Sequence, residues 1–221
     1  MSNENIDIHK VKITKKQTDG IRFSFCSLIL ILFCTFLVVV STFLQLNISH
    51  LILPLKAFGN GNLTIHDFVY TYKFIPQIPV IMFLAAFLGR KYGITSVLLY
   101  IIAGLFFVPI FALGGGLKYV FEYGFGYILA YIPAIFFAAS ILKSGYSNRN
   151  MIHATIVGVL TIHIIGVFYM LIIALLRHEG WMFMESWIVA QSGIKIIYDM
   201  IFGFFGMFLA KYARLLIWAY M

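Results

Sequence analysis

The sequence predicts an all-α integral membrane protein of six transmembrane helices, with both termini in the cytoplasm. Of its 221 residues, 62% are hydrophobic and only 11% are charged, whereas soluble domains carry about 45–50% and about 25%. The mean hydropathy of +0.97 agrees with this. A soluble globule and a disordered chain are both excluded, because neither could keep so much apolar surface away from water.

The six predicted spans are apolar runs bounded by charged or turn residues. They cover residues 23–46, 75–88, 94–113, 126–142, 152–176 and 188–210. A transmembrane helix needs about 20 residues, so six helices and their connections use almost the whole chain. The sequence contains no P-loop and leaves no room for a nucleotide-binding domain. An ATP-driven step would therefore need a partner protein.

The distribution of basic residues sets the expected orientation, because cytoplasmic segments carry an excess of Lys and Arg. With the N-terminus inside, eleven basic residues fall inside: Lys10, Lys12, Lys15, Lys16, Arg22, Arg90, Lys91, Lys143, Arg149, Lys211 and Arg214. Four fall outside: Lys56, Lys73, Lys118 and Arg177. The net charge of +8 thus indicates a basic cytoplasmic tail over residues 1–22, followed by a membrane domain over residues 23–221. It does not indicate a nucleic-acid partner.

Two of the expected outer connections stand out. The one over residues 47–74 is the longest in the chain, and long loops in compact proteins are usually functional or mobile. We expect it to act as a lid. The next contains Gly114, Gly115 and Gly116, which could form a tight surface turn or let the backbone approach a ligand closely.

Two charged residues fall inside the sixth predicted span, where charge is costly and tends to mark a site. Lys195 and Asp199 are four residues apart and share a helical face with Tyr198. They could simply pair with each other. Alternatively, they could line an outward-facing pocket, where the lysine would meet an acid and the aspartate would accept N–H groups.

Further polar residues in or near the spans are weaker candidates. Tyr119 and Tyr127 flank the glycine-rich connection and could line a ligand site, as could Tyr100 in the third predicted span. His153 and His163 are interpreted as hydrogen-bonded structural histidines on broadly the same side of the fifth span, with a proton relay as the alternative. No metal-binding motif and no nucleophile-base arrangement is apparent, so neither a metal, a cofactor nor an enzymatic activity is expected. The tryptophans, Trp187 among them, are expected at the membrane interface.

Three consecutive segments resemble the BioY family of biotin transporters, which are substrate-binding S components of energy-coupling-factor (ECF) transporters. They are IPQIPVIMFLAAFLGRKYG (75–93), SVLLYIIAGLFFVPIFALGGG (96–116) and GFGYILAYIPA (124–134). The family's last helix often begins with P-G-D-x-x-K. The comparable stretch here is SGIKIIYD (192–199), which has both charge types in reversed order.

The resemblance implies an S-component-like fold in the cell membrane and biotin as the solute. It also implies partners, namely a transmembrane T component and ATPase subunits. The resemblance thus supplies the solute, and the polar residues and glycines described above supply the expected substrate-binding residues: Lys195, Asp199, Tyr198, Gly115, Gly116, Tyr119, Tyr127 and Tyr100. Two alternatives remain: an S component for another small vitamin, and a proton-coupled secondary transporter of a small organic acid.

Overall fold

Four helical stretches are long and apolar enough to cross a membrane in the computed structural model, which describes residues 25–51 and 69–220. They are Phe25–Phe43, Phe125–Leu142, Asn148–Leu176 and Trp181–Leu216. The prediction of an all-α membrane protein is confirmed, apart from a two-stranded ribbon. The expected tail over residues 1–22 and the middle of the expected lid, with Lys56, lie outside the described residues.

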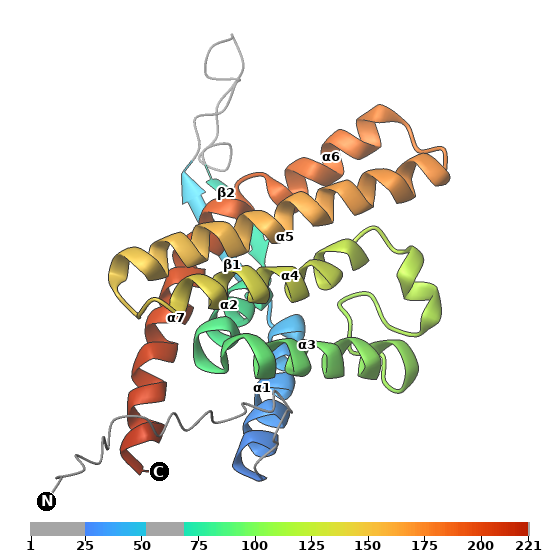
Figure 1. The fold of residues 1–221 in the computed structure, drawn as a ribbon. Helices are drawn as coiled ribbons and strands as arrows, with labels where there is room; N and C mark the ends of the chain where they lie inside the picture. Colours follow the sequence, from blue (N-terminus) through green and yellow to red (C-terminus); the bar gives the residue numbers. More distant parts are fainter. Residues whose placement is uncertain (1–24, 52–68, 221) are drawn as a thin grey trace, which may run out of the picture.

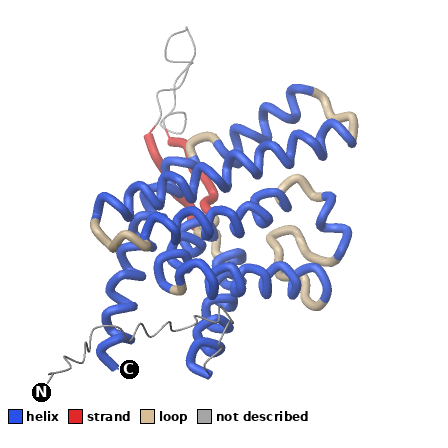
Figure 2. The backbone as a smooth tube through the Cα atoms, in the orientation of Figure 1, coloured by secondary structure: helices blue, strands red, loops and turns tan. Residues whose placement is uncertain are grey.

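The elements follow one another as a chain of helices interrupted once by the ribbon (Figures 1 and 2). They are α1 (Phe25–Phe43), β1 (Leu46–Leu51), β2 (Val69–Phe74), α2 (Gln77–Phe87), α3 (Gly89–Phe106), the 3-10 helix η3 (Leu117–Phe121), α4 (Phe125–Leu142), α5 (Asn148–Leu176), α6 (Trp181–Ser192) and α7 (Lys195–Tyr220).

Helix α4 is at the centre of the arrangement. It packs between α3 and α5 and also contacts α2, while α7 packs along α2 and α5. In Figure 1, α6 folds back along α5. Helices α1 and α7 lie at a steep angle to the layer formed by α3, α4 and α5. Small residues allow this packing: Ala130, Ala134 and Ala138 repeat every four residues on α4 and are fully buried.

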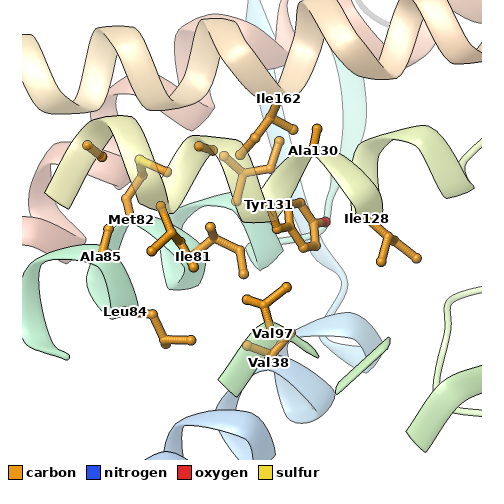
Figure 3. Close-up of a cluster of buried hydrophobic side chains, with 14 of the residues drawn as sticks. Val38, Ile81, Met82, Leu84, Ala85, Val97, Ile128, Ala130, Tyr131 and Ile162 are labelled. Atoms are coloured by element: carbon orange, nitrogen blue, oxygen red, sulfur yellow. The ribbon is translucent and has the colours of Figure 1, made fainter. Parts of the chain in front are cut away.

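The main core lies where α2, α3, α4 and α5 meet (Figure 3). Ile81, Met82, Val97, Tyr131 and Ile162 all contribute buried side chains to it. The outer faces of the helices, in contrast, expose large apolar side chains such as those of Phe36, Ile164 and Phe168. Such a surface suits contact with lipid, which does not penalise exposed hydrocarbon as water does.

Hydrogen bonds fasten α7 to the end of the bundle that we expect in the cytoplasm. Arg214 of α7 donates to the carbonyl of Ala86 at the end of α2 and to the hydroxyl of Tyr146 in the α4–α5 turn. Tyr146 donates to the same carbonyl over 2.8 Å. Burial raises the pKa of Tyr146, so its hydroxyl stays neutral and keeps its proton for this bond. One backbone acceptor thus joins three segments.

Several predicted boundaries were wrong. Helix α3 begins at Gly89 and ends at Phe106, not at 94 and 113. It can start directly after α2 because Gly89 adopts a positive φ of 72°, which a glycine tolerates. The expected loop over 47–74 begins and ends in strands, because β1 and β2 pair in antiparallel register from Leu46↔Phe74 to Leu51↔Val69.

The largest error concerns the sixth predicted span, 188–210. The helix is interrupted at Gly193, between α6 and α7. An apolar run hides this break because Ile188, Val189 and Ile194 lie on both sides of it. Lys195 is therefore the first residue of α7 rather than a residue well inside a helix.

Candidate solute-binding site

A cavity of about 260 Å³ lies at the bundle end that carries the α3–α4 connection. This volume is just below the range of about 300–1,000 Å³ that is usual for ligand pockets, which restricts the cavity to a small molecule. Polar groups in its wall come from Gln77, Tyr119, Glu122, Tyr123, Tyr127, Tyr131, Gln191 and Lys195. Apolar surface comes from Ile78, Leu113, Ile128 and Trp187, among others. The mixture of an aromatic wall and a few polar groups is typical of small-molecule sites.

Lys195 is the cation in this wall, and Asp199 holds it. The Lys195 ammonium donates to Oδ2 of Asp199 over 2.6 Å, one turn along α7. Asp199 is fully buried and does not line the cavity, whereas Lys195 does. Both interpretations of the pair therefore have a basis in the structure: the two residues form an ion pair, and the lysine is also placed to meet a ligand.

A network of buried and half-buried side chains continues from this pair. His163 of α5 is 3% exposed, and its Nε2 lies 3.1 Å from Oδ2 of Asp199. Its Nδ1 lies 2.9 Å from the hydroxyl of Ser192, which lies 2.6 Å from the hydroxyl of Tyr127. His163 is thus hydrogen-bonded, as expected. His153 is exposed on the outside of α5, so the expectation that the two histidines share a side was wrong. Ten residues of helix turn through about 1,000°, which leaves them about 80° apart.

Three of the eight predicted site residues line the cavity: Lys195, Tyr119 and Tyr127. Tyr119 is buried under the α3–α4 connection, and burial raises the pKa of its hydroxyl above the usual value. It therefore offers a neutral hydroxyl to a ligand. Its ring packs on that of Phe111, with 4.6 Å between the ring centres.

The other predicted residues lie around the cavity rather than in its wall. Tyr100 is fully buried and accepts a hydrogen bond of 2.9 Å from Gln77, whose side chain does line the cavity. Tyr198 packs its ring on Phe74, with 6.1 Å between the ring centres. Asp199 acts through Lys195.

Gly115 and Gly116 allow the α3–α4 connection to adopt its backbone conformation and to pack on α3. A Cβ at Gly115 would lie 2.7 Å from the carbonyl oxygen of Gly104, so only glycine allows the loop to pack on α3. Gly116 has a φ of 87° and donates its N–H to the same carbonyl over 2.9 Å. Neither lines the cavity, so the structure gives them a packing role.

Sequence reasoning missed several wall residues, and one of them had a usable signal. Tyr131 follows Tyr127 by four residues, which places both on one face of α4. Trp187, expected at the membrane interface, lines the cavity instead. It belongs to α6, which the sequence did not separate from the sixth span. Gln77 and Gln191 carry no pattern that distinguishes them from other polar residues at helix ends.

The mouth of the cavity is linked to the α5–α6 turn. Tyr123, in the cavity wall, donates to Glu179 over 2.7 Å. The Arg177 guanidinium lies over the Tyr123 ring, 4.6 Å from its centre, and donates to the backbone carbonyl of Phe121 over 2.9 Å. These contacts, which we call the outer latch, hold the loop before α4 against the turn after α5.

A second hollow, of about 350 Å³, is less suited to a solute. It lies between α1, α2 and α7 and is lined by apolar residues such as Phe74, Pro79, Phe202 and Leu209. Its wall contains no polar side chain from the described part of the chain, so these residues offer no group that could orient a polar ligand. Among the described residues, there is also no group of three or more His, Cys, Asp or Glu side chains that could hold a metal ion.

The fold places the chain in a class of membrane proteins. It matches a crystal structure described as the S-component for biotin from an ECF-type ABC transporter, with a TM-score of 0.63. The match covers 87% of this chain and 95% of that one at 18% sequence identity. The chain therefore has the S-component fold, as the sequence predicted.

The family follows from the sequence. The BioY family model matches residues 14–217, and the chain belongs to the BioY family. It is a multi-pass protein of the cell membrane. A protein of Lysinibacillus sphaericus described as a probable biotin transporter BioY is 33% identical over 121 residues. That alignment covers 51% of this chain and 57% of the relative, so the chain matches just over half of the relative's length.

Proposed function

We propose that this chain binds biotin from the outer side of the membrane, as the substrate-binding component of an ECF-type transporter. The observation that carries the proposal is the cavity wall, in which the Lys195 ammonium faces the same space as Tyr119, Tyr127, Tyr131 and Trp187. Biotin carries a carboxylate, a cyclic urea and an apolar bicyclic ring with an alkyl tail. These groups need a cation, hydrogen-bonding partners and aromatic walls, respectively.

Lys195 is the main polar contact in this proposal. In one arrangement it meets the carboxylate, and Asp199 accepts a ureido N–H. In the other, Lys195 donates to the ureido oxygen. Asp199 is fully buried and does not line the cavity, so the first arrangement requires its Oδ1 to become accessible when the ligand binds. Among the described residues, this oxygen is the buried side-chain atom without a hydrogen-bond partner. Such atoms are rare and call for an explanation.

Transport itself would require partner proteins. We propose a T component and ATPase subunits, because the S-component fold of this chain has counterparts in ECF transporters. The chain would contribute binding and no chemical step. The expected six spans and the cytoplasmic placement of both termini belong to this proposal as well.

The test is equilibrium binding of radiolabelled biotin to the full chain in lipid nanodiscs. We expect saturable binding that unlabelled biotin abolishes and that riboflavin and thiamine leave unchanged. Lys195→Ala should weaken it at least tenfold, while Lys211→Ala, also on α7 but away from the cavity, should not. Displacement by another vitamin but not by biotin would point to an S component for that vitamin instead.

A further inference from the structure

The network behind the cavity links Tyr127 to Asp199 through two side chains on other helices. Tyr127 belongs to α4, Ser192 to α6, His163 to α5 and Asp199 to α7. The successive distances are 2.6, 2.9 and 3.1 Å. Tyr127 is also a wall residue of the cavity, so one end of the network borders the cavity and the other is a buried carboxylate.

The carboxylate sets the direction of every hydrogen bond in the network. Asp199 is ionised in its pair with Lys195 and can only accept, so Nε2 of His163 must donate to it. A neutral imidazole protonated at Nε2 has an accepting Nδ1. Ser192 must therefore donate its single proton to Nδ1. The bond between Tyr127 and Ser192 can then form only if Tyr127 is the donor.

The neutral form of His163 also fits the charges around it. The charged group that bonds to it is Asp199, from α7, whose charge is matched by Lys195 at 2.6 Å. Ser192 from α6 faces its other nitrogen, and the Tyr127 ring of α4 lies edge-on to it, with 5.8 Å between the ring centres. Within this network, a second proton on His163 would leave an uncompensated charge in a buried site, which is costly.

We propose that this network makes the Tyr127 hydroxyl an acceptor-only group for the ligand, with His163 and Ser192 as the positioning residues that impose this. With its proton committed to Ser192, the Tyr127 oxygen has only lone pairs left for the cavity. The ligand must then supply an N–H or O–H donor at this end. This inference rests on the proposed function and deepens it, by making Tyr127 the acceptor of one ureido N–H of biotin.

The donor and acceptor roles in this hydrogen-bond network can be measured without any ligand. The probe is nitrogen-15 NMR of the ligand-free chain in nanodiscs at pH 7 with labelled histidine. The chain has six histidines, and His163→Gln identifies the signal of interest. If that variant does not fold, single variants of the other five assign it by elimination. We expect a neutral imidazole with Nε2 protonated and Nδ1 bare. A proton on Nδ1, alone or in addition, would overturn the proposal.

The consequence for specificity is tested with two biotin analogues, in each of which CH2 replaces one ureido NH. Tyr127→Phe should weaken biotin binding about tenfold, the scale of one lost hydrogen bond that leaves a buried group unpaired. The same substitution should leave the affinity for one of the two analogues unchanged. Equal losses for biotin and both analogues would contradict the acceptor role.

The two positioning residues have a matched control. Ser192→Ala frees the Tyr127 proton, so the hydroxyl can donate as well as accept. We therefore expect it to reduce several-fold the preference for biotin over the analogue in which an oxygen atom replaces that ureido NH. His153→Gln, on the exposed face of the same α5, should change nothing. An unchanged preference in Ser192→Ala would count against the proposal. If the wild type shows the expected tautomer but binds no biotin, the proposed function fails while the direction of the network stands.

Discussion

The Lys195 ammonium and the Asp199 carboxylate of α7 lie 2.6 Å apart, yet only the lysine lines the cavity. The ion pair therefore forms part of the wall of the proposed binding site. Asp199, which is also hydrogen-bonded to His163, holds the lysine in place at the first residue of α7, where the helix begins after the break at Gly193.

The first prediction concerns the cost of breaking this pair. Asp199→Ala should lower the free energy of unfolding by about 3–5 kcal/mol, because it leaves a buried cation without its partner. The double variant Lys195→Met, Asp199→Ala should be more stable than Asp199→Ala alone, since no charge is left behind. Thermal unfolding in nanodiscs measures both. A double variant less stable than either single one would show that the pair is not a coupled unit.

The second prediction concerns the outer latch. Tyr123→Phe removes the 2.7 Å bond to Glu179 and should speed the release of bound biotin about fivefold, equivalent to about 1 kcal/mol. Glu179→Gln should have a smaller effect in the same direction, because an amide still accepts a hydrogen bond. Glu185→Gln, on the exposed side of α6, is the control. Stopped-flow displacement measures the release rate. Release at the wild-type rate in Tyr123→Phe would show that the outer latch does not slow the dissociation of biotin.

The third prediction tests the packing that holds Tyr127. A Cβ at Gly166 of α5 would lie 2.5 Å from the Tyr127 ring, so Gly166→Ala must displace the ring or the helix. We expect it to cost about 1–3 kcal/mol of stability and to weaken biotin binding. Gly180→Ala serves as the control, because nothing lies within 4 Å of a Cβ there. Equal behaviour of the two variants would mean that the contact does not position Tyr127.

The fourth prediction separates stability from binding. Tyr146→Phe removes the hydroxyl that joins Ala86 and Arg214 at the end of the bundle opposite the cavity. It should lower the free energy of unfolding by about 1 kcal/mol while leaving the affinity for biotin unchanged. Thermal unfolding and equilibrium binding of one preparation measure the two effects. A weakened affinity would show that the two ends of the bundle are coupled.

Helices with distinct sequence boundaries were predicted well. Helix α4 was expected at 126–142 and runs from Phe125 to Leu142, since Gly124 precedes it and Lys143 follows. Helix α5 begins four residues earlier than expected because Ser147 caps it, accepting a hydrogen bond from the N–H of Asn150. The α6–α7 break was missed because one apolar run continues across it.

The site was predictable where chemistry alone marks a residue. A lysine and an aspartate in an apolar segment stand out, and Lys195 is indeed in the cavity wall. Tyr131 and Trp187 look like ordinary core or interface aromatics, and their role depends on how α4 and α6 face each other. The link from His163 to Ser192 joins residues 29 positions apart, and only the break at Gly193 brings Ser192 to that point.

The central claim is that this cavity binds biotin through Lys195, and isothermal titration of biotin into the full chain in nanodiscs tests it most directly. The account predicts a single saturable site in the wild type and in Lys211→Ala, and at least tenfold weaker binding in a folded Lys195→Ala. Undiminished binding by Lys195→Ala would contradict the placement of the site. Absence of binding by a folded wild type would contradict biotin as the solute.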